Sequence, residues 1–317
     1  MLKHKVSDLG KAKSYESARH ELYTQLVESC GQEQAHWVQD QINKYNGAET
    51  SQKLGVLGES LQTISKLFSK KHTIISFSER PHAALSSPYG MLPFGHWLNT
   101  DLARVYLIAK VFGECLPLEA RFSTLFNLYD ESDTEGKVAC LRALNFIEGV
   151  IHDGLTIVHD AGRTYLSELL EAAWCNNLFS SEQMNTEEFR KAIMKALFCN
   201  VSIEGFLGID RAADQELSRR LCEYANEREA AERTVPHSVW RIASYHPIPG
   251  MVARLIGHLE HPIREERLTA AISLGRAKDQ LSVPFLKDRL EREEDHEVHD
   301  QISKALGHLR AEVNNIK

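Results

Sequence analysis

The sequence has 317 residues, of which 43% are hydrophobic and 26% are charged, and its formal net charge is −7. A chain of this size can bury a substantial core and is long enough for about two domains. The acidic balance argues against a general nucleic-acid binder, which usually shows a basic balance or a basic face. We therefore expect no nucleic-acid partner.

The six cysteines lie far apart and form no CxxC motif. This distribution is typical of thiols in a reducing compartment and not of a disulfide framework. The first residues are basic but lack the apolar stretch of a secretory signal. No segment approaches the roughly eighteen consecutive apolar residues of a membrane span. These features predict a cytoplasmic protein, and they leave open a peripheral contact at the inner face of a membrane.

The positions of the prolines and the spacing of the apolar residues predict the first secondary-structure elements. Three prolines between residues 81 and 93 predict one long irregular loop. Asn99 and Thr100 are candidate caps of the next helix, whose apolar residues recur at helical steps. Those residues are Leu102, Val105, Tyr106, Ala109 and Phe112. Strand-like runs are scarce, with 72–78 and 154–158 the two worth naming, so the pattern predicts an all-α protein.

Two acidic or histidine-containing segments raise the question of a metal. Asp130-Glu-Ser-Asp133 resembles an aspartate-rich box of prenyl-chain enzymes, but it precedes a helix start and is interpreted as a loop with an N-cap. His152-Asp153 and His159-Asp160 contain the ligand types of HD-type metal-dependent hydrolases. Gly154 and Gly162 predict an interrupted helix there, so polar residues at helix ends are the favoured interpretation. A metal site built from His152, Asp153, His159 and Asp160 is the alternative.

Two further helices are expected over residues 186–199 and 214–231. Asn185 and Glu188 stand at capping-box spacing before the first. On the second, Arg228 falls on the same face as apolar residues, where an unpaired cation would be costly. One interpretation is an ion-pair network in which Asp210, Glu216 and Glu227 supply partners.

The other interpretation is a polar pocket between these two helices that binds an anionic or phenolic metabolite. Tyr224, Arg228 and Arg241 would be the donors in this pocket, and Lys195 would add positive charge nearby. Neither interpretation requires a cofactor, and the sequence contains no Ser-His-Asp elbow, P-loop or dinucleotide fingerprint.

The last seventy or so residues contain an internal repeat, because 266–275 aligns with 298–307. The run Asp295-His-Glu-Val-His-Asp-Gln-Ile-Ser-Lys-Ala-Leu-Gly307 resembles the second helix of short HEAT repeats. Small residues at Ala270 and Ala305 would let neighbouring helices approach closely. Each Leu-Gly pair predicts a helix end with a left-handed glycine cap. Such repeats usually offer a binding surface.

The stretch 189–241 resembles the EboA family of metabolite-traffic proteins. The similarity rests on 189–198, on Gly208-Ile-Asp-Arg-Ala-Ala-Asp-Gln-Glu-Leu217, on Leu221-Cys-Glu-Tyr-Ala-Asn-Glu-Arg228 and on Val239-Trp-Arg241. Asn177-Leu-Phe179 stands where the family has N-P-Y. The sequence departs from the family pattern at Phe189, Ala212, Asp214, Asn226 and Glu229.

This resemblance implies a helper or scaffold without a defined catalytic activity. The expected fold is all-α, with antiparallel helical hairpins stacked as a HEAT-like superhelix. We expect an EboA-like helical domain over 1–243 and a repeat tail over 244–317 packed on it. Expected partners are other proteins of a metabolite biosynthesis or export assembly, some of them membrane-associated, and a small-molecule metabolite. Candidate binding residues are Lys195, Asp210, Arg211, Glu216, Tyr224, Glu227, Arg228 and Arg241. A metal-dependent all-α hydrolase or prenyl-chain enzyme is the alternative.

Overall fold

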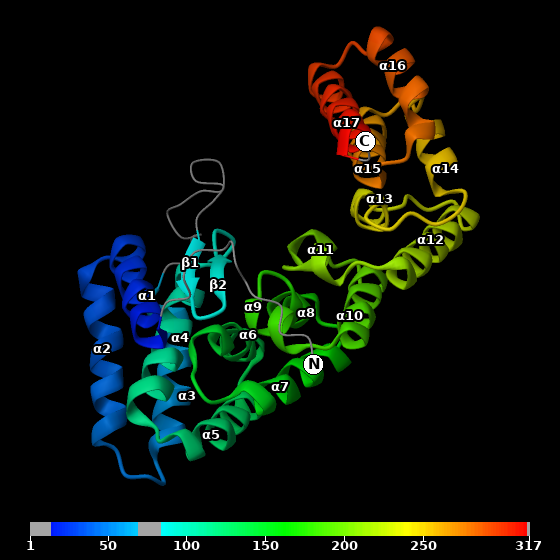
Figure 1. The fold of residues 1–317 in the computed structure, drawn as a ribbon. Helices are drawn as coiled ribbons and strands as arrows, with labels where there is room; N and C mark the ends of the chain where they lie inside the picture. The colour runs from blue at the N-terminus through cyan, green and yellow to red at the C-terminus, as the bar shows by residue number, and fades with distance from the viewer. Residues whose placement is uncertain (1–13, 69–83, 316–317) are drawn as a thin grey trace. The chain divides into compact units, whose positions relative to one another are not determined.

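The computed structural model describes residues 14–68 and 84–315, apart from the side chains of His152 and residues 311–315. The chain divides into two compact units (Figure 1). Unit 1 runs up to Ala192 and also includes 196–201 and 205–207, whereas unit 2 comprises 193–195, 202–204 and the residues from Gly208 onward. The all-α prediction is confirmed, because the described residues form helices and a single two-stranded sheet. The stacking of the hairpins as a superhelix stays a prediction.

Unit 1 consists of helices and one small hairpin. Its elements are α1 (Tyr15–Cys30), α2 (Gln32–Gly47), α3 (Lys53–Leu67), β1 (Ala84–Ser87), β2 (Gly90–Pro93), α4 (Asn99–Lys110), a π-helix η1 (Val111–Cys115), α5 (Leu118–Glu131), α6 (Thr134–Ala143), α7 (Ile151–Arg163), α8 (Ser167–Trp174) and α9 (Leu178–Gln183). A short 3-10 helix spans Leu144–Phe146. Helix α10 (Thr186–Phe198) and the 3-10 helix Ile203–Gly205 contribute residues to both units.

Helix α4 is the core of unit 1 and packs against α1, α2, α3 and α6. The sequence predicts one buried face, but every residue from Asn99 to Ala109 is buried. Arg104 is among them: it donates to the Leu61 carbonyl at 3.2 Å and pairs with Glu135 at 2.5 Å. A helix buried all round belongs to the interior of a protein. Arg104 is tolerated there because its donors have acceptors.

The start of α4 differs from the prediction by about one residue. Asn99 and Thr100 lie inside the first turn, and neither caps it from outside. The capping contact comes from Asp101, whose Oδ2 accepts the Leu98 N–H at 2.8 Å. The other two predicted caps are confirmed. Asp133 accepts the Gly136 N–H at 2.8 Å, and Asn185 and Glu188 exchange reciprocal bonds of 3.0 and 2.9 Å.

The predicted loop over 81–93 is wrong from residue 84 onward, because β1 and β2 pair there as an antiparallel hairpin. Ser87 pairs with Gly90, so the turn has two residues, and Gly90 takes a positive φ of 131°. Pro88 sits in the turn, and Pro93 ends β2. Because neither proline interrupts the ladder, their presence misled the sequence analysis. The strand-like run 72–78 lies outside the described residues.

Gly154 and Gly162 do not interrupt α7, contrary to the prediction. Each glycine lets an aromatic ring approach the helix. A Cβ at residue 154 would lie 2.6 Å from Phe179 Cζ, and one at residue 162 would lie 2.9 Å from Trp174 Cζ2. The glycines are therefore packing residues between α7 and the helices α8 and α9.

Helical glycines that contact a neighbouring side chain and helical glycines beside open space should respond to alanine with opposite changes in stability. Gly154→Ala should destabilise the protein by about 1–3 kcal/mol, because the added methyl group overpacks the contact with Phe179. Gly58→Ala in α3 is the control, since no atom lies within 4 Å of its added Cβ. The control should instead stabilise the protein by about 0.5–1 kcal/mol through helix propensity. Urea denaturation measures both, and equal signs would contradict the packing argument.

Unit 2 contains α11 (Ile209–Ala212), α12 (Gln215–Ala230), α13 (His237–Ala243), α14 (Met251–His258), α15 (Arg264–Ala277), a 3-10 turn (Gln280–Ser282), α16 (Val283–Arg292) and α17 (His296–Asn315). Helix α13 packs against both α12 and α15, and α14 packs on α15. The expected boundary after residue 243 falls inside this unit. The division into a family domain and a repeat tail stays a prediction.

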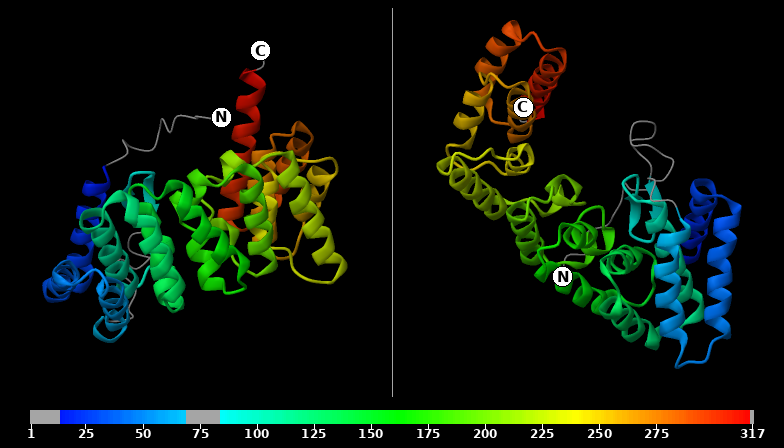
Figure 2. Two further views of the ribbon diagram at one scale, coloured as in Figure 1. Left: turned by 90° about the horizontal axis from the view of Figure 1, so that it is seen from below. Right: turned by 180° about the vertical axis from the view of Figure 1, so that it is seen from behind.

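Helices α15 and α17 lie side by side in Figures 1 and 2 and carry the repeated sequence. A Cβ at Gly275 would lie 3.0 Å from the Cβ of Ala305, which confirms the close approach expected at Ala305, whereas that at Ala270 stays a prediction. The predicted glycine caps are wrong. Helix α15 continues to Ala277 and ends at Lys278 with a φ of 54°, while Gly307 lies in the middle of α17. The repeated glycine at 275 therefore serves helix packing.

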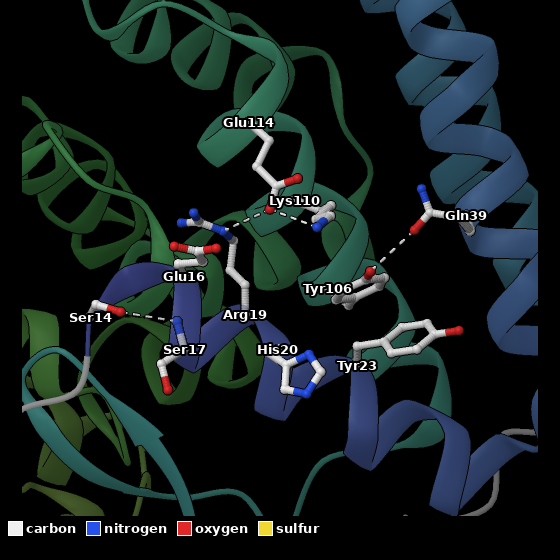
Figure 3. Close-up of a pocket in the computed structure, with 10 residues that line it drawn as sticks. All are labelled: Ser14, Glu16, Ser17, Arg19, His20, Tyr23, Gln39, Tyr106, Lys110 and Glu114. Carbon is white, nitrogen blue, oxygen red and sulfur yellow. Dashed lines mark hydrogen bonds and ion pairs between the residues drawn. The ribbon is translucent and has the colours of Figure 1, made fainter.

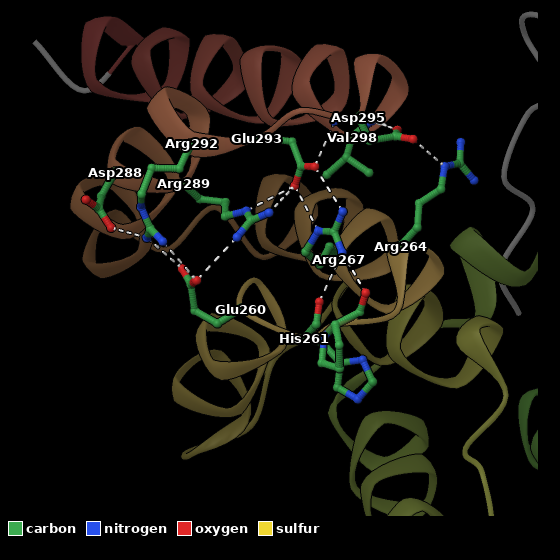
Figure 4. A network of polar contacts seen from close by, with 11 residues as sticks. Glu260, His261, Arg264, Arg267, Asp288, Arg289, Arg292, Glu293, Asp295 and Val298 are labelled. Carbon is green, nitrogen blue, oxygen red and sulfur yellow. Dashed lines mark hydrogen bonds and ion pairs between the residues drawn. The ribbon is translucent and has the colours of Figure 1, made fainter.

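A buried carboxylate joins the helices of unit 2 (Figure 4). The Glu293 side chain is 1% exposed and accepts hydrogen bonds from Arg267 at 2.9 and 3.0 Å and from Arg289 at 2.8 and 3.0 Å. The backbone N–H of Asp295 donates to it as well, at 3.0 Å. Arg267 lies on α15 and Arg289 on α16, so this one carboxylate ties two helices to the segment that leads into α17.

Candidate ligand-binding site in unit 1

A cavity of about 590 Å³ opens between α1, α2 and the end of α4 (Figure 3). This volume is within the usual range of small-molecule sites. Its lining residues are Ser14, Glu16, Ser17, Arg19, His20, Tyr23, Gln39, Tyr106, Lys110 and Glu114. All of them belong to unit 1.

Arg19 is the unusual residue of this cavity. It is 7% exposed, yet its Nε and Nη1 have no hydrogen-bond acceptor among the described residues. Glu114 Oε1 lies 3.7 Å from Nε, beyond ordinary hydrogen-bond length. Buried donors without acceptors are costly and rare in folded proteins. Both nitrogens are covered by protein atoms and lie close to Gly113.

The backbone next to Arg19 is also unusual. Helix α4 passes directly into the π-helix η1, which carries Gly113 and Glu114. A Cβ on Gly113 would lie 2.5 Å from Arg19 Cζ, so the guanidinium occupies the space that a side chain would fill. Arg121 donates to the Gly113 carbonyl at 3.0 Å and holds the turn in place. Short π-helical turns of this kind are frequent at functional sites.

Two cations and two carboxylates line this cavity. Lys110 Nζ lies 2.6 Å from Glu114 Oε1, the same oxygen that faces Arg19. Glu16 is the second carboxylate of the lining, and its side chain is exposed like that of Glu114. The lining therefore carries charges of both signs.

Two tyrosines form the aromatic part of the lining. The rings of Tyr23 and Tyr106 lie 5.4 Å apart with an interplanar angle of 42°. The Tyr106 hydroxyl donates to Gln39 Oε1 at 3.4 Å. Burial raises the pKa of Tyr106, and the nearby Tyr23 and Glu114 raise that pKa further. The phenol therefore stays protonated near neutral pH and acts as a neutral hydrogen-bonding group.

Comparison with known proteins places the chain in a family. A family model described as metabolite traffic protein EboA matches residues 18–244. The chain belongs to the EboA family. No curated protein matches the chain. The family match includes the cavity residues from Arg19 to Glu114, so the site lies mostly within the EboA region.

The eight binding residues expected from the EboA motifs all fall in unit 2. Lys195 is half-buried, and Asp210, Arg211 and Glu227 are exposed. The described contacts of Glu216, Arg228 and Arg241 are with different partner residues, and none of them joins two of these three side chains. Arg241, for example, contacts Glu204 at 3.3 Å and Thr269 at 3.5 Å. Since Phe189 and most of α10 belong to unit 1, the pocket expected between the two EboA helices stays a prediction.

Arg228 has different partners from those expected. Its Nε donates to the Thr234 carbonyl at 2.6 Å, its Nη1 donates to the Tyr224 hydroxyl at 3.3 Å, and its guanidinium lies 5.7 Å from the Tyr224 ring centroid. Glu216 is held by Arg219 and Arg220. Because Arg228 is only half-buried, a carbonyl, a hydroxyl and an aromatic ring satisfy it without a carboxylate.

The sequence analysis of this EboA protein missed the cavity of unit 1, although a signal was present. On α1, Arg19 directly follows the buried residue Ala18 and lies about one helical turn before the buried residue Leu22. This is the same pattern, a cation beside an apolar stripe, that drew attention to Arg228. The π-helical turn gives no comparable signal, because Val111–Cys115 continues the helical periodicity of α4.

The alternative metal ligands are dispersed among the described side chains. His159 Nε2 lies 3.4 Å from Glu188, Asp153 is exposed, and Asp160 interacts with Tyr129. No group of three histidine, cysteine or acidic side chains able to hold a metal occurs in the part of the chain that is described. The His152 side chain lies outside that part. None of the described helices has the length and apolar composition that a membrane crossing requires.

Proposed function

We propose that this EboA protein is a non-catalytic component of metabolite traffic that binds an acidic small molecule in the cavity of unit 1. The observation that carries the proposal is the cavity of about 590 Å³, whose lining brings Arg19 and Lys110 together with Tyr23 and Tyr106. Two cations at the wall of a cavity can form charge-assisted hydrogen bonds with an acid group of a ligand.

The proposal includes protein partners. We propose that the protein acts in the cytoplasm, at the inner face of a membrane, together with other proteins of a metabolite biosynthesis or export assembly. Membership of a metabolite-traffic family supports this assignment. The repeated helices α15 and α17 also support it, because HEAT-like repeats usually serve as binding surfaces. In this proposal, unit 1 holds the metabolite and the HEAT-like helices of unit 2 contact the partner proteins.

Affinity purification from the native host tests the proposal. Mass spectrometry would identify proteins and small molecules that co-purify with the wild type and with Arg19→Gln. We expect the wild type to retain an acidic compound that Arg19→Gln loses, with partner proteins retained by both. Arg163→Gln is the matched control, because Arg163 is an exposed arginine of unit 1. A protein that carries a stoichiometric metal and neither an acidic compound nor partners would overturn the proposal.

A further inference from the structure

An apolar strip lies along one side of α5. Its members are Leu118, Phe122 and Phe126, which are spaced four residues apart and therefore share one face of the helix. Leu118 is 52% exposed, Phe126 is 37% exposed and Phe122 is half-buried. The rings of Phe122 and Phe126 lie 5.9 Å apart, so they form a continuous surface. Adjoining exposed apolar side chains of this kind mark interaction sites.

The apolar strip lies on the side of α5 that borders α7. The two helices pack on each other, and they start together and end together. At their starts, a Cβ on Gly149 would lie 2.7 Å from Leu118 Cδ2, and at their ends the side chains of Tyr129 and Asp160 interact. Tyr129 follows Phe126 by three residues, so both lie on the same side of α5. The strip therefore runs parallel to α7 over most of its length.

Exposed carboxylates border the apolar strip. Glu119 belongs to the first turn of α5, Glu148 precedes α7, and Asp153 belongs to the first turn of α7. Asp153 precedes Asp160 by seven residues, about two helical turns, so it lies on the side of α7 that borders α5. None of the three exposed carboxylates forms an ion pair with a described residue. The nearby Arg121 is buried and donates to three backbone carbonyls.

The other cations near the strip lie at its far end. Lys137 Nζ is 5.0 Å from the centroid of the Tyr129 ring, and Arg163 is the last residue of α7. Negative charge is thus concentrated where α5 and α7 begin. This distribution suits an occupant that carries apolar residues on one face and positive charge beside them. A second copy of the strip is a poor occupant, because it would bring the same carboxylates together.

Helix α1 begins near this acidic end of the strip. In its second turn, the Arg19 guanidinium lies against Gly113. Arg121 of α5 donates to the Gly113 carbonyl at 3.0 Å and to the Glu148 carbonyl at 2.9 Å, so the starts of α1, α5 and α7 adjoin. Residues 1–13 directly precede this point. A chain of that length can extend about 40 Å, whereas the strip spans about 12 Å, so the segment can reach all of it.

The sequence of residues 1–13 complements the strip and its carboxylates. Three apolar residues recur in it at helical spacing, and they are Leu2, Val6 and Leu9. Its charged side chains are four lysines and one aspartate, namely Lys3, Lys5, Lys11, Lys13 and Asp8. Along a helix, Leu2 and Leu9 would be about 10 Å apart, close to the length of the strip.

We propose that residues 1–13 bind along the apolar strip of α5. Their apolar residues cover Leu118, Phe122 and Phe126, and their lysines lie beside the carboxylates at the starts of α5 and α7. The contact buries apolar surface that the described residues leave exposed, and it pairs carboxylates that have no other ion-pair partner among them. It is independent of the ligand proposed for the cavity.

Tryptic cleavage of the full chain after Lys5 tests the proposal. A bound segment is cut only while it is released, so the cleavage rate follows the released fraction. Phe126→Gln should raise this rate at least about fivefold, because it removes an apolar contact of the bound segment. Phe198→Gln is the matched control, since Phe198 is an aromatic residue of α10 that is 64% exposed and lies outside the strip. The control should leave the rate unchanged.

A variant in the segment itself guards against loss of folding. Leu9→Gln lies outside the packed helices and should raise cleavage after Lys5 as much as Phe126→Gln does. The double variant should be cleaved no faster than either single variant, because the two side chains belong to one contact. Melting temperatures show that each variant is folded.

Carbodiimide cross-linking and mass spectrometry locate the segment. The reagent joins a lysine directly to a carboxylate in contact with it. We expect Lys3 and Lys5 to be joined to Asp153 or Glu119 and not to Glu33, an exposed carboxylate in the first turn of α2. Asp153→Asn should raise cleavage after Lys5 about twofold, as expected for an exposed ion pair, and Glu33→Gln should have no effect.

Three results would overturn the inference. The first is an equal cleavage rate in the wild type, Phe126→Gln and Leu9→Gln, with cross-links from Lys3 and Lys5 to Glu33 as frequent as those to Asp153. The second is a wild-type dimer that Phe126→Gln converts into a monomer, which would assign the strip to a second copy of the chain. The third is a partner protein that Phe126→Gln releases while the cleavage rate stays the same, which would assign the strip to that partner.

Discussion

Replacing Glu293 with alanine is expected to destabilise unit 2 by about 3–5 kcal/mol. The carboxylate is 1% exposed and is the shared acceptor of Arg267 and Arg289. Its removal would take this counter-charge from both guanidinium groups and would leave Arg289 with the exposed Glu260, and each guanidinium would have lost hydrogen bonds. Urea denaturation, followed through the hydrogen exchange of α15 and α17, measures the loss where it occurs.

Glu260 provides the matched control for this prediction. It also pairs with Arg289, at 3.3 Å, and with Arg292 at 2.9 Å, but its side chain is 51% exposed. Exposed ion pairs contribute about 0–1 kcal/mol because water screens them. We expect Glu260→Ala to fall in that range. Equal losses for Glu260→Ala and Glu293→Ala would mean that burial does not determine the strength of this network.

The same carboxylate gives a pH dependence. Burial alone would raise the pKa of Glu293, but hydrogen bonds from Arg267, the Asp295 backbone and Arg289 outweigh it and lower the pKa to about 2. Because the folded pKa lies below the ordinary glutamate value, the contribution to stability is fully present above pH ~4.5. It is lost as the pH falls towards 2. Glu293→Gln should flatten the fall in unfolding free energy over this interval.

The second large effect is expected at Asn177. We expect Asn177→Ala to destabilise unit 1 by about 3 kcal/mol, because truncation leaves several buried polar groups without partners. The Asn177 amide donates to the carbonyls of Leu141 and Ala172 at 3.2 and 2.8 Å. Its oxygen accepts from the Asn145 side chain at 3.2 Å and from the Ser180 N–H at 3.3 Å. Thermal and urea denaturation of the full chain measure the loss.

Asn185→Ala is the comparison for this prediction. Asn185 caps α10 from an exposed position with a bond of 3.0 Å to the Glu188 N–H. An exposed cap of this kind contributes about 1 kcal/mol. If both substitutions cost the same, Asn177 acts as a local helix cap only, and its bonds to residues from α6 and α8 would add nothing.

The fold class was predictable because it rests on local patterns. Period and capping spacing identified the helices around Asn185 and Asp133, and the structure confirms both caps. The errors arose where tertiary packing determines the role of a residue. In the sequence, Gly154 and Gly275 have the appearance of helix breakers, but in the structure each allows a neighbouring helix to pack closely. A single sequence does not reveal the neighbour.

The candidate site was less predictable, for a related reason. Arg19 and Glu114 are 95 positions apart in the chain and meet only through the packing of α1 on α4. No spacing rule links them. The EboA motifs drew attention to residues 189–241, where the family pattern is dense. Family motifs show which residues the members share in sequence. A buried donor without an acceptor can be recognised only in the folded structure, because it depends on how the helices pack.

The family match ends at residue 244, yet α13 just before this point is part of a unit that continues to the end of the described chain. Trp240 on α13 is 1% exposed, and residues beyond the match cover it: Arg254 at 4.5 Å and His258 at 5.8 Å from its ring. Removing the C-terminal helices would therefore expose this tryptophan to water. Relatives that lack them should carry a smaller or more polar residue at that position, and gene fusions that exchange the tail should join before α11.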